Sequence, residues 1–238
     1  MYAQATSKIA NPVAYPIPAM CRGMEREAAS RIASISTLQT VVAGRSLFAE
    51  GDTAENVYEV VRGMLKLYKL LPDGRRQIMG FMSAGDLLGL SFSGVYPYTA
   101  EAVTEVTLCR YSRARFDRLV DEVPGFARRL LAVRSDELRA AQDQMLLLGR
   151  KMAVEKISSF LLMLAERQIT GDDPDIVLVP MSRNDIADYL GLTTETVCRT
   201  LTKLKSKNVI KSLTTANIKL VDRDKLEDLA GGEFQEEF

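Results

Sequence analysis

Along residues 38–120 the hydrophobic positions fall in short runs that glycines separate. These runs are apolar or alternate between apolar and polar residues, as strands with one buried face do. Between two of them, Pro72 presets φ and Gly74 accepts a positive φ, which predicts a hairpin turn. Many short strands at this spacing predict a closed or sandwich-like, jelly-roll-like antiparallel barrel, which we place within residues 31–120. The predicted strands include Val57–Val61, Met64–Tyr68 and Ala102–Leu108.

After Gly125 the pattern changes to a seven-residue period, and we predict a long helix over residues 121–149. The first row of the period is unbroken, whereas Arg134 interrupts the second row, which also holds Ala127. Two interpretations stay open: a dimerisation helix, or one amphipathic helix packed on its own β-roll. The unbroken row favours a dimer, because alanine in the second row lets two helices approach closely. The predicted dimer interface is Leu131, Leu138, Ala141, Met145, Leu148 and Met152.

The remaining residues, 150–238, contain two short helices joined by a tight turn. A hinge at residues 149–151 and a helix over Ala153–Gln168 come first. Ser182 is a typical N-cap for a helix that ends at Leu190, and Gly191 opens a three-residue turn. A second helix then runs from Thr194 to about residue 207. This order is the layout of a helix-turn-helix.

The second of these helices has two different faces. Val197, Leu201 and Leu204 form an apolar stripe, while Glu195, Cys198, Arg199 and Thr202 lie toward solvent. An exposed arginine can bond guanine O6 and N7, and a glutamate can accept from cytosine N4. The alternative is an ordinary ion pair between Glu195 and Arg199, worth about 0.3–0.5 kcal/mol.

Local charge favours the base-reading interpretation. Residues 195–219 hold six basic residues and one acidic residue, so the segment that would enter a major groove attracts phosphates. Two short strands around residues 208–211 and 218–221 resemble a wing. We therefore predict base reading by Glu195 and Arg199 and a phosphate contact by Lys203. Beyond residue 222 the charge is negative, and we interpret that end as a solvated tail.

Composition narrows the class of protein. The 238 residues are 47% hydrophobic, carry equal numbers of basic and acidic residues, and include no histidine. Triad hydrolysis, most catalytic zinc and His-ligated haem are excluded by that absence, so we predict neither an enzyme nor a metal site. Three scattered cysteines and the lack of a long apolar run indicate a cytoplasmic protein without membrane contact. Residues 1–30 read as a proline-containing arm.

Three segments resemble the CRP/FNR transcription regulators, and among them the FixK-type regulators of microaerobic metabolism. They are Gly85-Asp86-Leu87-Leu88-Gly89, Leu147–Lys151 and Ile186–Arg199, and the similarity covers about residues 30–220. The resemblance implies a cyclic-nucleotide-binding-type β-roll, a dimerisation helix and a winged helix-turn-helix. It also implies a homodimer on a palindrome of TTGA-like half-sites and contact with RNA polymerase. By the same resemblance, the base-reading residues are Thr194, Glu195, Cys198 and Arg199, and the further phosphate contacts are Ser182, Arg183 and Thr196.

The family's ligands do not match this sequence. Cyclic-AMP receptors place a phosphate-binding arginine before a Ser or Thr about a dozen residues after a Gly-Glu motif, where this chain has Tyr98-Thr99-Ala100, and Asp86 replaces the glutamate. FNR holds an iron–sulfur cluster with four cysteines, whereas only Cys21 and Cys109 are candidates here. We therefore expect no cofactor, with Cys109 buried in the β-roll core.

Cys198 lies beside Arg199 on the predicted DNA-facing side, which leaves two interpretations open. It can be a small residue that fits against DNA, or a redox-sensitive thiol whose oxidation adds bulk and charge that block binding. Two other function classes are a cupin-like enzyme and a ligand-sensing module without DNA binding. The lack of histidine argues against the first, and the predicted winged helix argues against the second.

Overall fold

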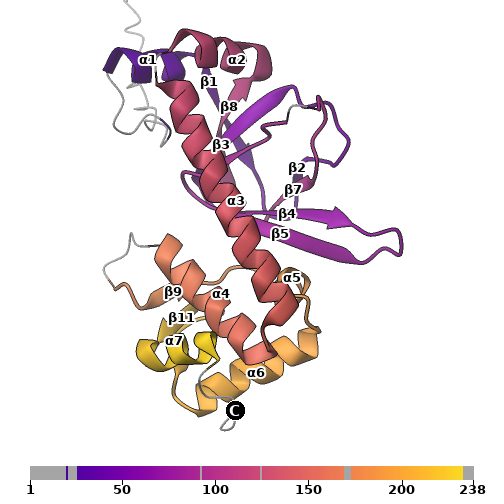
Figure 1. Cartoon of the computed structure of the whole chain (residues 1–238), viewed down its shortest axis with the longest axis vertical. Coiled ribbons are helices and arrows are strands. Elements are labelled where there is room, and N and C mark those ends of the chain that lie inside the picture. The colour runs from indigo at the N-terminus through magenta and orange to yellow at the C-terminus, as the bar shows by residue number, and fades with distance from the viewer. Residues whose placement is uncertain (1–19, 21–25, 92, 124, 169–172, 233–238) are drawn as a thin grey trace, which may run out of the picture.

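The structure is a computed structural model, and it describes residues 20, 26–91, 93–123, 125–168 and 173–232. A β-roll with two short helices forms one end of the molecule, and a winged helix-turn-helix forms the other (Figure 1). The long helix α3 (Phe126–Arg150) runs between them. This arrangement confirms the predicted α+β fold class and its order of parts.

The β-roll consists of two four-stranded antiparallel sheets, with orders β1-β8-β3-β6 and β2-β7-β4-β5. The predicted turn joins β4 to β5: the Gly74 amide donates to the carbonyl of Leu71, and the Leu71 amide donates to that of Arg75. The strands are β1 (Ser36–Val41), β2 (Ser46–Phe48), β3 (Asn56–Arg62), β4 (Leu65–Leu70), β5 (Arg76–Met82), β6 (Leu87–Leu88), β7 (Thr99–Ala102) and β8 (Val106–Ser112).

One predicted strand was wrong, because Ala102–Leu108 spans the end of β7, a bend and the start of β8. The bend packs closely on the chain at Gly63, which has φ of 90° and where a β-carbon would lie 2.2 Å from the carbonyl oxygen of Glu105. The Met64 amide donates to the Thr104 hydroxyl at 3.0 Å. These contacts stabilise the bend, so the apolar alternation across it does not produce a continuous strand.

The predicted arm over residues 1–30 is partly wrong. Its residues 1–19 and 21–25, Cys21 among them, lie outside the described residues, but Arg26–Ser34 forms helix α1. Ile32 is fully buried against α2 (Arg113–Glu122) and the β-roll, which explains why this stretch is helical. The prediction divided residues 113–122 between the β-roll and the long helix, but they form the separate helix α2. Gly125, with φ of 82°, precedes α3, so the long helix begins only at Phe126.

Within residues 150–168 and 173–232, the C-terminal part contains four helices and a three-stranded sheet of order β10-β11-β9. The helix predicted over Ala153–Gln168 and both helices of the helix-turn-helix are confirmed to within a residue, whereas β9 was not predicted. The elements are α4 (Ala153–Arg167), β9 (Ile176–Leu178), α5 (Arg183–Leu190), α6 (Thr194–Ser206), β10 (Ile210–Ser212), β11 (Asn217–Leu220) and α7 (Arg223–Gly231). In the part of the chain that is described, no helix is long and apolar enough to cross a bilayer.

The interpretation of residues after 222 as a solvated tail is wrong for α7. Leu226 and Leu229 are buried against α4, and the Asp222 carboxylate accepts the Lys225 amide hydrogen at 3.0 Å as the N-cap. The acidic residues of α7 lie on the outer face of an amphipathic helix, so a count of charges does not show that the other face packs on α4.

Candidate nucleic-acid interface

Helix α5 begins in a reciprocal cap. The Asp185 amide donates to the Ser182 hydroxyl at 3.0 Å, and Asp185 Oδ2 accepts from the Ser182 hydroxyl at 2.7 Å and amide at 3.2 Å. The Ser182 hydroxyl hydrogen is thus already used inside the chain. Of the two phosphate contacts predicted here, half-buried Arg183 at the first position of α5 is better placed to donate to a phosphate.

The turn between α5 and α6 requires glycine. Gly191 has φ of 62°, and a β-carbon there would lie 3.3 Å from Cδ2 of Leu148 on α3. Thr193 then caps α6: its hydroxyl accepts the Thr196 amide hydrogen at 3.1 Å. These local features place α6 at the end of the molecule away from α1 and α2 (Figure 1).

Helix α6 has the two predicted faces. Val197, Leu201 and Leu204 are buried in the core of the winged helix, each stabilising the fold by about 1.5–3 kcal/mol. Glu195, Cys198, Arg199, Thr202 and Lys203 are exposed on the other face. An uncovered helix face of this kind can enter a major groove.

Thr194 and Thr196, like Ser182, already form hydrogen bonds within the chain. The Thr194 hydroxyl donates to Asn184 Oδ1 at 2.7 Å, which links the start of α6 to α5. The hydroxyl oxygens of Thr193 and Thr196 are 2.8 Å apart. The Thr194 hydroxyl hydrogen is thus used within the chain, although its oxygen can still accept a hydrogen bond from a base. The Thr196 hydroxyl can donate to a phosphate when Thr193 is the donor of the pair.

Basic side chains surround this face. Lys203, Lys205 and Lys207 lie exposed along α6, and Lys211 is exposed on β10 of the wing. Lys219 on β11 pairs with Asp173 at 3.2 Å. The positive charge predicted from the sequence is thus gathered on α6 and the wing, where a duplex backbone would lie.

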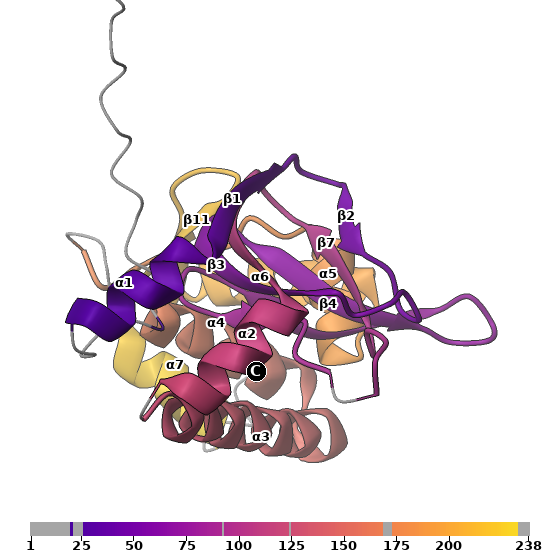
Figure 2. The same cartoon turned by 90° about the horizontal axis from the view of Figure 1, so that it is seen from above.

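On α3, much of the predicted dimer interface is uncovered. Leu131, Leu138 and Met145 are 71%, 61% and 70% exposed, and Met152, after the end of α3, and Ala141 are also exposed. Leu148 differs, because it is half-buried against the Gly191 turn of its own chain. Figure 2 shows α3 along one side of the molecule, with the β-roll on its other side.

Aromatic rings pack together among the aliphatic side chains of the β-roll core. Phe48 stacks on Tyr96 with centroids 3.7 Å apart and lies 5.9 Å from the rings of both Tyr58 and Tyr98. Burial raises the pKa of the Tyr58 phenol, so this group stays neutral. Cys109 is buried as predicted, and burial raises its pKa, with the Glu59 carboxylate adding to the effect.

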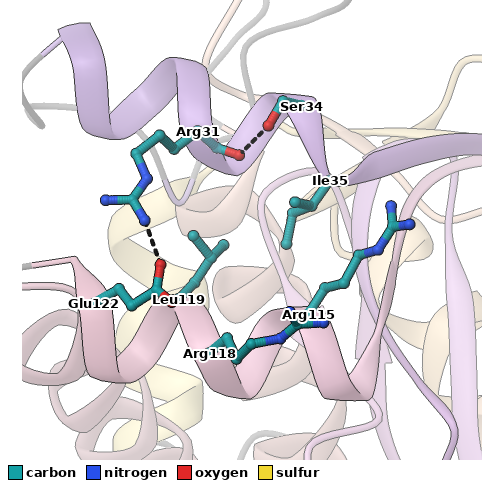
Figure 3. Close-up of a pocket in the computed structure, with 7 residues that line it drawn as sticks. All are labelled: Arg31, Ser34, Ile35, Arg115, Arg118, Leu119 and Glu122. Atoms are coloured by element: carbon teal, nitrogen blue, oxygen red, sulfur yellow. Dashed lines mark hydrogen bonds and ion pairs between the residues drawn. The ribbon is translucent and has the colours of Figure 1, made fainter.

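A hollow of about 260 Å³ lies outside the β-roll, between α1 and α2 (Figure 3). Arg115 and Arg118 line it, while Arg31 pairs with Glu122 across it. In the described residues no three His, Cys, Asp or Glu side chains cluster as metal ligands would.

A group of buried and half-buried charges between the β-roll and α5 was not predicted. Lys66 on β4 is 2.8 Å from Asp185 and 3.0 Å from Glu101, and Arg76 on β5 is 2.7 Å from Asp185 and 2.8 Å from Asp188. We call these five residues the interdomain charge cluster. More than a hundred residues separate its two sides, so no local sequence pattern indicates it.

Comparison with known proteins gives matches to both parts of the chain. A model of the cyclic nucleotide-binding domain matches residues 38–123, and a model of the Crp-like helix-turn-helix domain matches residues 155–229. The chain is 46% identical to the nitrogen fixation regulation protein FixK of Bradyrhizobium diazoefficiens over 79% of each protein. The chain belongs to the CRP/FNR family. This CRP/FNR protein is also similar to FixK of Rhizobium meliloti, with 39% identity over 78% of this chain and 83% of that one.

The fold agrees with this membership. The structure of FixK2 from Bradyrhizobium japonicum superposes with a TM-score of 0.77 at 37% identity, covering 82% of this chain and 97% of that chain. The resemblance to FixK-type members of the CRP/FNR family, inferred from three short motifs, is therefore confirmed.

Proposed function

We propose that this CRP/FNR protein is a transcription activator that binds a palindrome of TTGA-like half-sites as a homodimer, without a bound effector. The observation that carries the proposal is the exposed face of α6, where Glu195 and Arg199 stand among lysines. Arg199 would read a guanine and Glu195 a cytosine, with Thr194 and Cys198 at neighbouring base positions. Ser182, Arg183, Thr196 and Lys203 would contact phosphates, Ser182 after its hydroxyl leaves Asp185.

The uncovered stripe on α3 supports a homodimer. Its leucine and methionine side chains are more than half exposed and are seven residues apart. Pairing with the same stripe on a second copy would remove this apolar surface from water. The two copies of α6 would then face successive turns of the duplex, as palindromic half-sites require.

The β-roll interior supports effector-free binding. Rings of Phe48, Tyr58 and Tyr96 pack in its core, and the segment Tyr98-Thr99-Ala100, which has no arginine, stands where cyclic-AMP receptors have their phosphate-binding Arg. Asp86 accepts the Ser83 amide hydrogen at 2.7 Å and pairs with Arg167 on α4, so its carboxylate is engaged within the chain. Without a guanidinium fork, a nucleotide phosphate would be buried uncompensated.

The biological process follows from the relatives. Similar proteins are named nitrogen fixation regulators, and others are named transcriptional activators, such as FnrL of Cereibacter sphaeroides at 34% identity. We infer control of microaerobic, respiratory or nitrogen-fixation genes through contact with RNA polymerase. Because these relatives are regulators, they support a role other than catalysis.

Cys198 is proposed as a redox-sensitive residue of the same interface. Its thiol is exposed beside Arg199 on the face that would meet DNA. Oxidation by a peroxide, which is itself reduced to water or an alcohol, adds bulk at the reversible sulfenic stage and a negative charge beside phosphates at the sulfinic stage, and both oppose binding. The unoxidised thiol is small enough to fit against a base, so the reduced protein is the active form.

Selection of bound duplexes from a random pool tests the proposal. The purified, reduced protein without added ligand should enrich a two-fold symmetric site with a guanine in each half-site. Enrichment of no sequence, or of an asymmetric single site, would contradict it. Arg199→Ala as a parallel sample should enrich no guanine at the same position.

A further inference from the structure

The interdomain charge cluster joins two parts of the chain that have only a short covalent connection. Helix α3 ends at Arg150, α4 begins at Ala153, and Lys151 at the junction has extended backbone with ψ of 145°. A two-residue junction of this kind does not by itself fix the angle between the helix-turn-helix and the β-roll. Noncovalent contacts must therefore set that angle.

Contacts from the β4–β5 hairpin reach α5 directly. Lys66 Nζ and Arg76 Nη2 both donate to Asp185 Oδ1, at 2.8 and 2.7 Å, and Arg76 Nε donates to Asp188 Oδ2 at 2.9 Å. Gln77 adds a hydrogen bond to the backbone carbonyl of Asp188 at 2.8 Å. The Lys66 and Asp185 side chains are each only 8% exposed.

Apolar packing beside the cluster gives little directional control. Ile78 and Phe81 of β5 extend the core of the winged helix, with the Phe81 ring 5.3 Å from Tyr189 and 6.1 Å from Phe160. Hydrophobic contacts tolerate sliding, whereas a forked guanidinium and a buried ammonium require their carboxylates at specific positions. A buried ion pair adds little net stability, but in some proteins it specifies one arrangement of the parts that it joins.

Asp185 also belongs to the DNA-facing end of the site. Its second carboxylate oxygen, Oδ2, accepts from Ser182, the cap that begins α5. One carboxylate thus binds the β-roll through Oδ1 and the first turn of the helix-turn-helix through Oδ2. Movement of the hairpin would therefore be transmitted to the end of α5 that lies near a phosphate.

We propose that Lys66 and Arg76 are positioning residues for DNA binding, which act through Asp185 and Asp188 to hold both copies of α6 at the half-site spacing. This inference rests on the proposed function. It assigns to charges inside the chain the orienting role that a bound effector would otherwise have. None of the four side chains needs to touch DNA.

The test measures spacing preference in the full chain. Affinities are compared for the selected palindrome and for the same palindrome with one base pair inserted between half-sites. For Arg76→Met we expect affinity for the native spacing to fall by about tenfold, typical of coupled sites, and preference over the inserted site to shrink. The preference for guanine within a half-site should stay unchanged. Lys66→Arg, which keeps the charge, should retain the spacing preference.

Lys69→Met is the matched control, because Lys69 lies on the same hairpin and its ion pair with Glu50 stays within the β-roll. It should behave as the wild type. If Arg76→Met is folded by thermal melting and keeps both affinity and spacing preference, the proposal is overturned. Asp188→Asn, whose side chain is nearer the surface, serves if Arg76→Met does not fold, with the same expected loss of spacing preference.

A second measurement does not depend on DNA. Spin labels on Cys198 and on Arg110→Cys, in a Cys21→Ser background, report the distance between α6 and β8. Wild type should give a narrow distribution and Arg76→Met a broad one. Equal widths would overturn the proposal, while a narrow wild-type distance with no DNA selection would contradict only the proposed function.

Discussion

A guanidinium nitrogen of Arg199 lies 3.9 Å from a carboxylate oxygen of Glu195, one turn earlier on α6. The two side chains are 71% and 85% exposed. An exposed pair at this separation is worth at most about 1 kcal/mol, so separating the two groups to meet bases costs little. The ion-pair interpretation and the base-reading interpretation are therefore compatible.

Glu195→Ala should reduce the preference for cytosine at one position of each half-site by about 1–3 kcal/mol, since the acceptor for cytosine N4 is removed. Competition binding with single-base variants of the selected palindrome measures this preference. If Glu195→Ala keeps the full base preference, Glu195 serves only as the partner of Arg199.

Leu138→Glu on α3 should dissociate the dimer. Each subunit would lose about 1.5–3 kcal/mol of apolar burial and gain a charge facing its counterpart. Sedimentation equilibrium measures the dissociation constant. Leu70→Glu is a matched control, because Leu70 on the hairpin is 62% exposed and Leu138 is 61% exposed. If the two variants have the same dimer dissociation constant, Leu138 does not lie in the dimer interface.

Peroxide should abolish DNA binding of the reduced protein, with recovery on reduction at the early stages of thiol oxidation. Cys198→Ser should stay active under the same treatment. Iodoacetamide labelling followed by peptide mass spectrometry should modify exposed Cys198 much faster than Cys109, whose pKa burial raises. Reversible inactivation that persists in Cys198→Ser would assign the effect to another group.

Acid should weaken the docking of α5 on the β-roll. Burial by itself would raise the pKa of Asp185, but hydrogen bonds from Lys66 and Ser182 and the charges of Lys66 and Arg76 lower it below its ordinary value. A lowered folded-state pKa stabilises the fold above the unfolded pKa of about 3.9, and this contribution is lost as the pH falls through the folded pKa. The free energy of unfolding between pH 5 and 2 should fall less steeply in Asp185→Asn, and an unchanged slope would contradict this.

The sequence predicted the elements whose signals are local. The Ser182 cap, the Gly191 turn and the two faces of α6 all follow from residues within one or two helical turns. The hairpin at Pro72–Gly74 and the exposed seven-residue row on α3 follow in the same way. The structure agrees with these because local propensity and tertiary packing favour the same answer.

Long-range contacts explain what the sequence did not predict. The Ala102–Leu108 bend depends on close packing at Gly63, and α1 depends on burial of Ile32 against the β-roll. The role of α7 was concealed because its acidic residues dominate the count of charges while Leu226 and Leu229 pack inward. The interdomain charge cluster pairs residues that are more than a hundred positions apart, so no local sequence pattern indicates it.

The most direct measurement compares two duplexes with purified, reduced protein at low ionic strength and without added ligand. One is the selected palindrome, and the other has the guanine replaced in each half-site. Wild type should prefer the first, Arg199→Ala should lose about 1–3 kcal/mol of that preference per half-site, and Lys203→Ala should weaken both duplexes by the same factor. Equal wild-type affinity for the two duplexes, or full preference in Arg199→Ala, would contradict base reading by an effector-free α6.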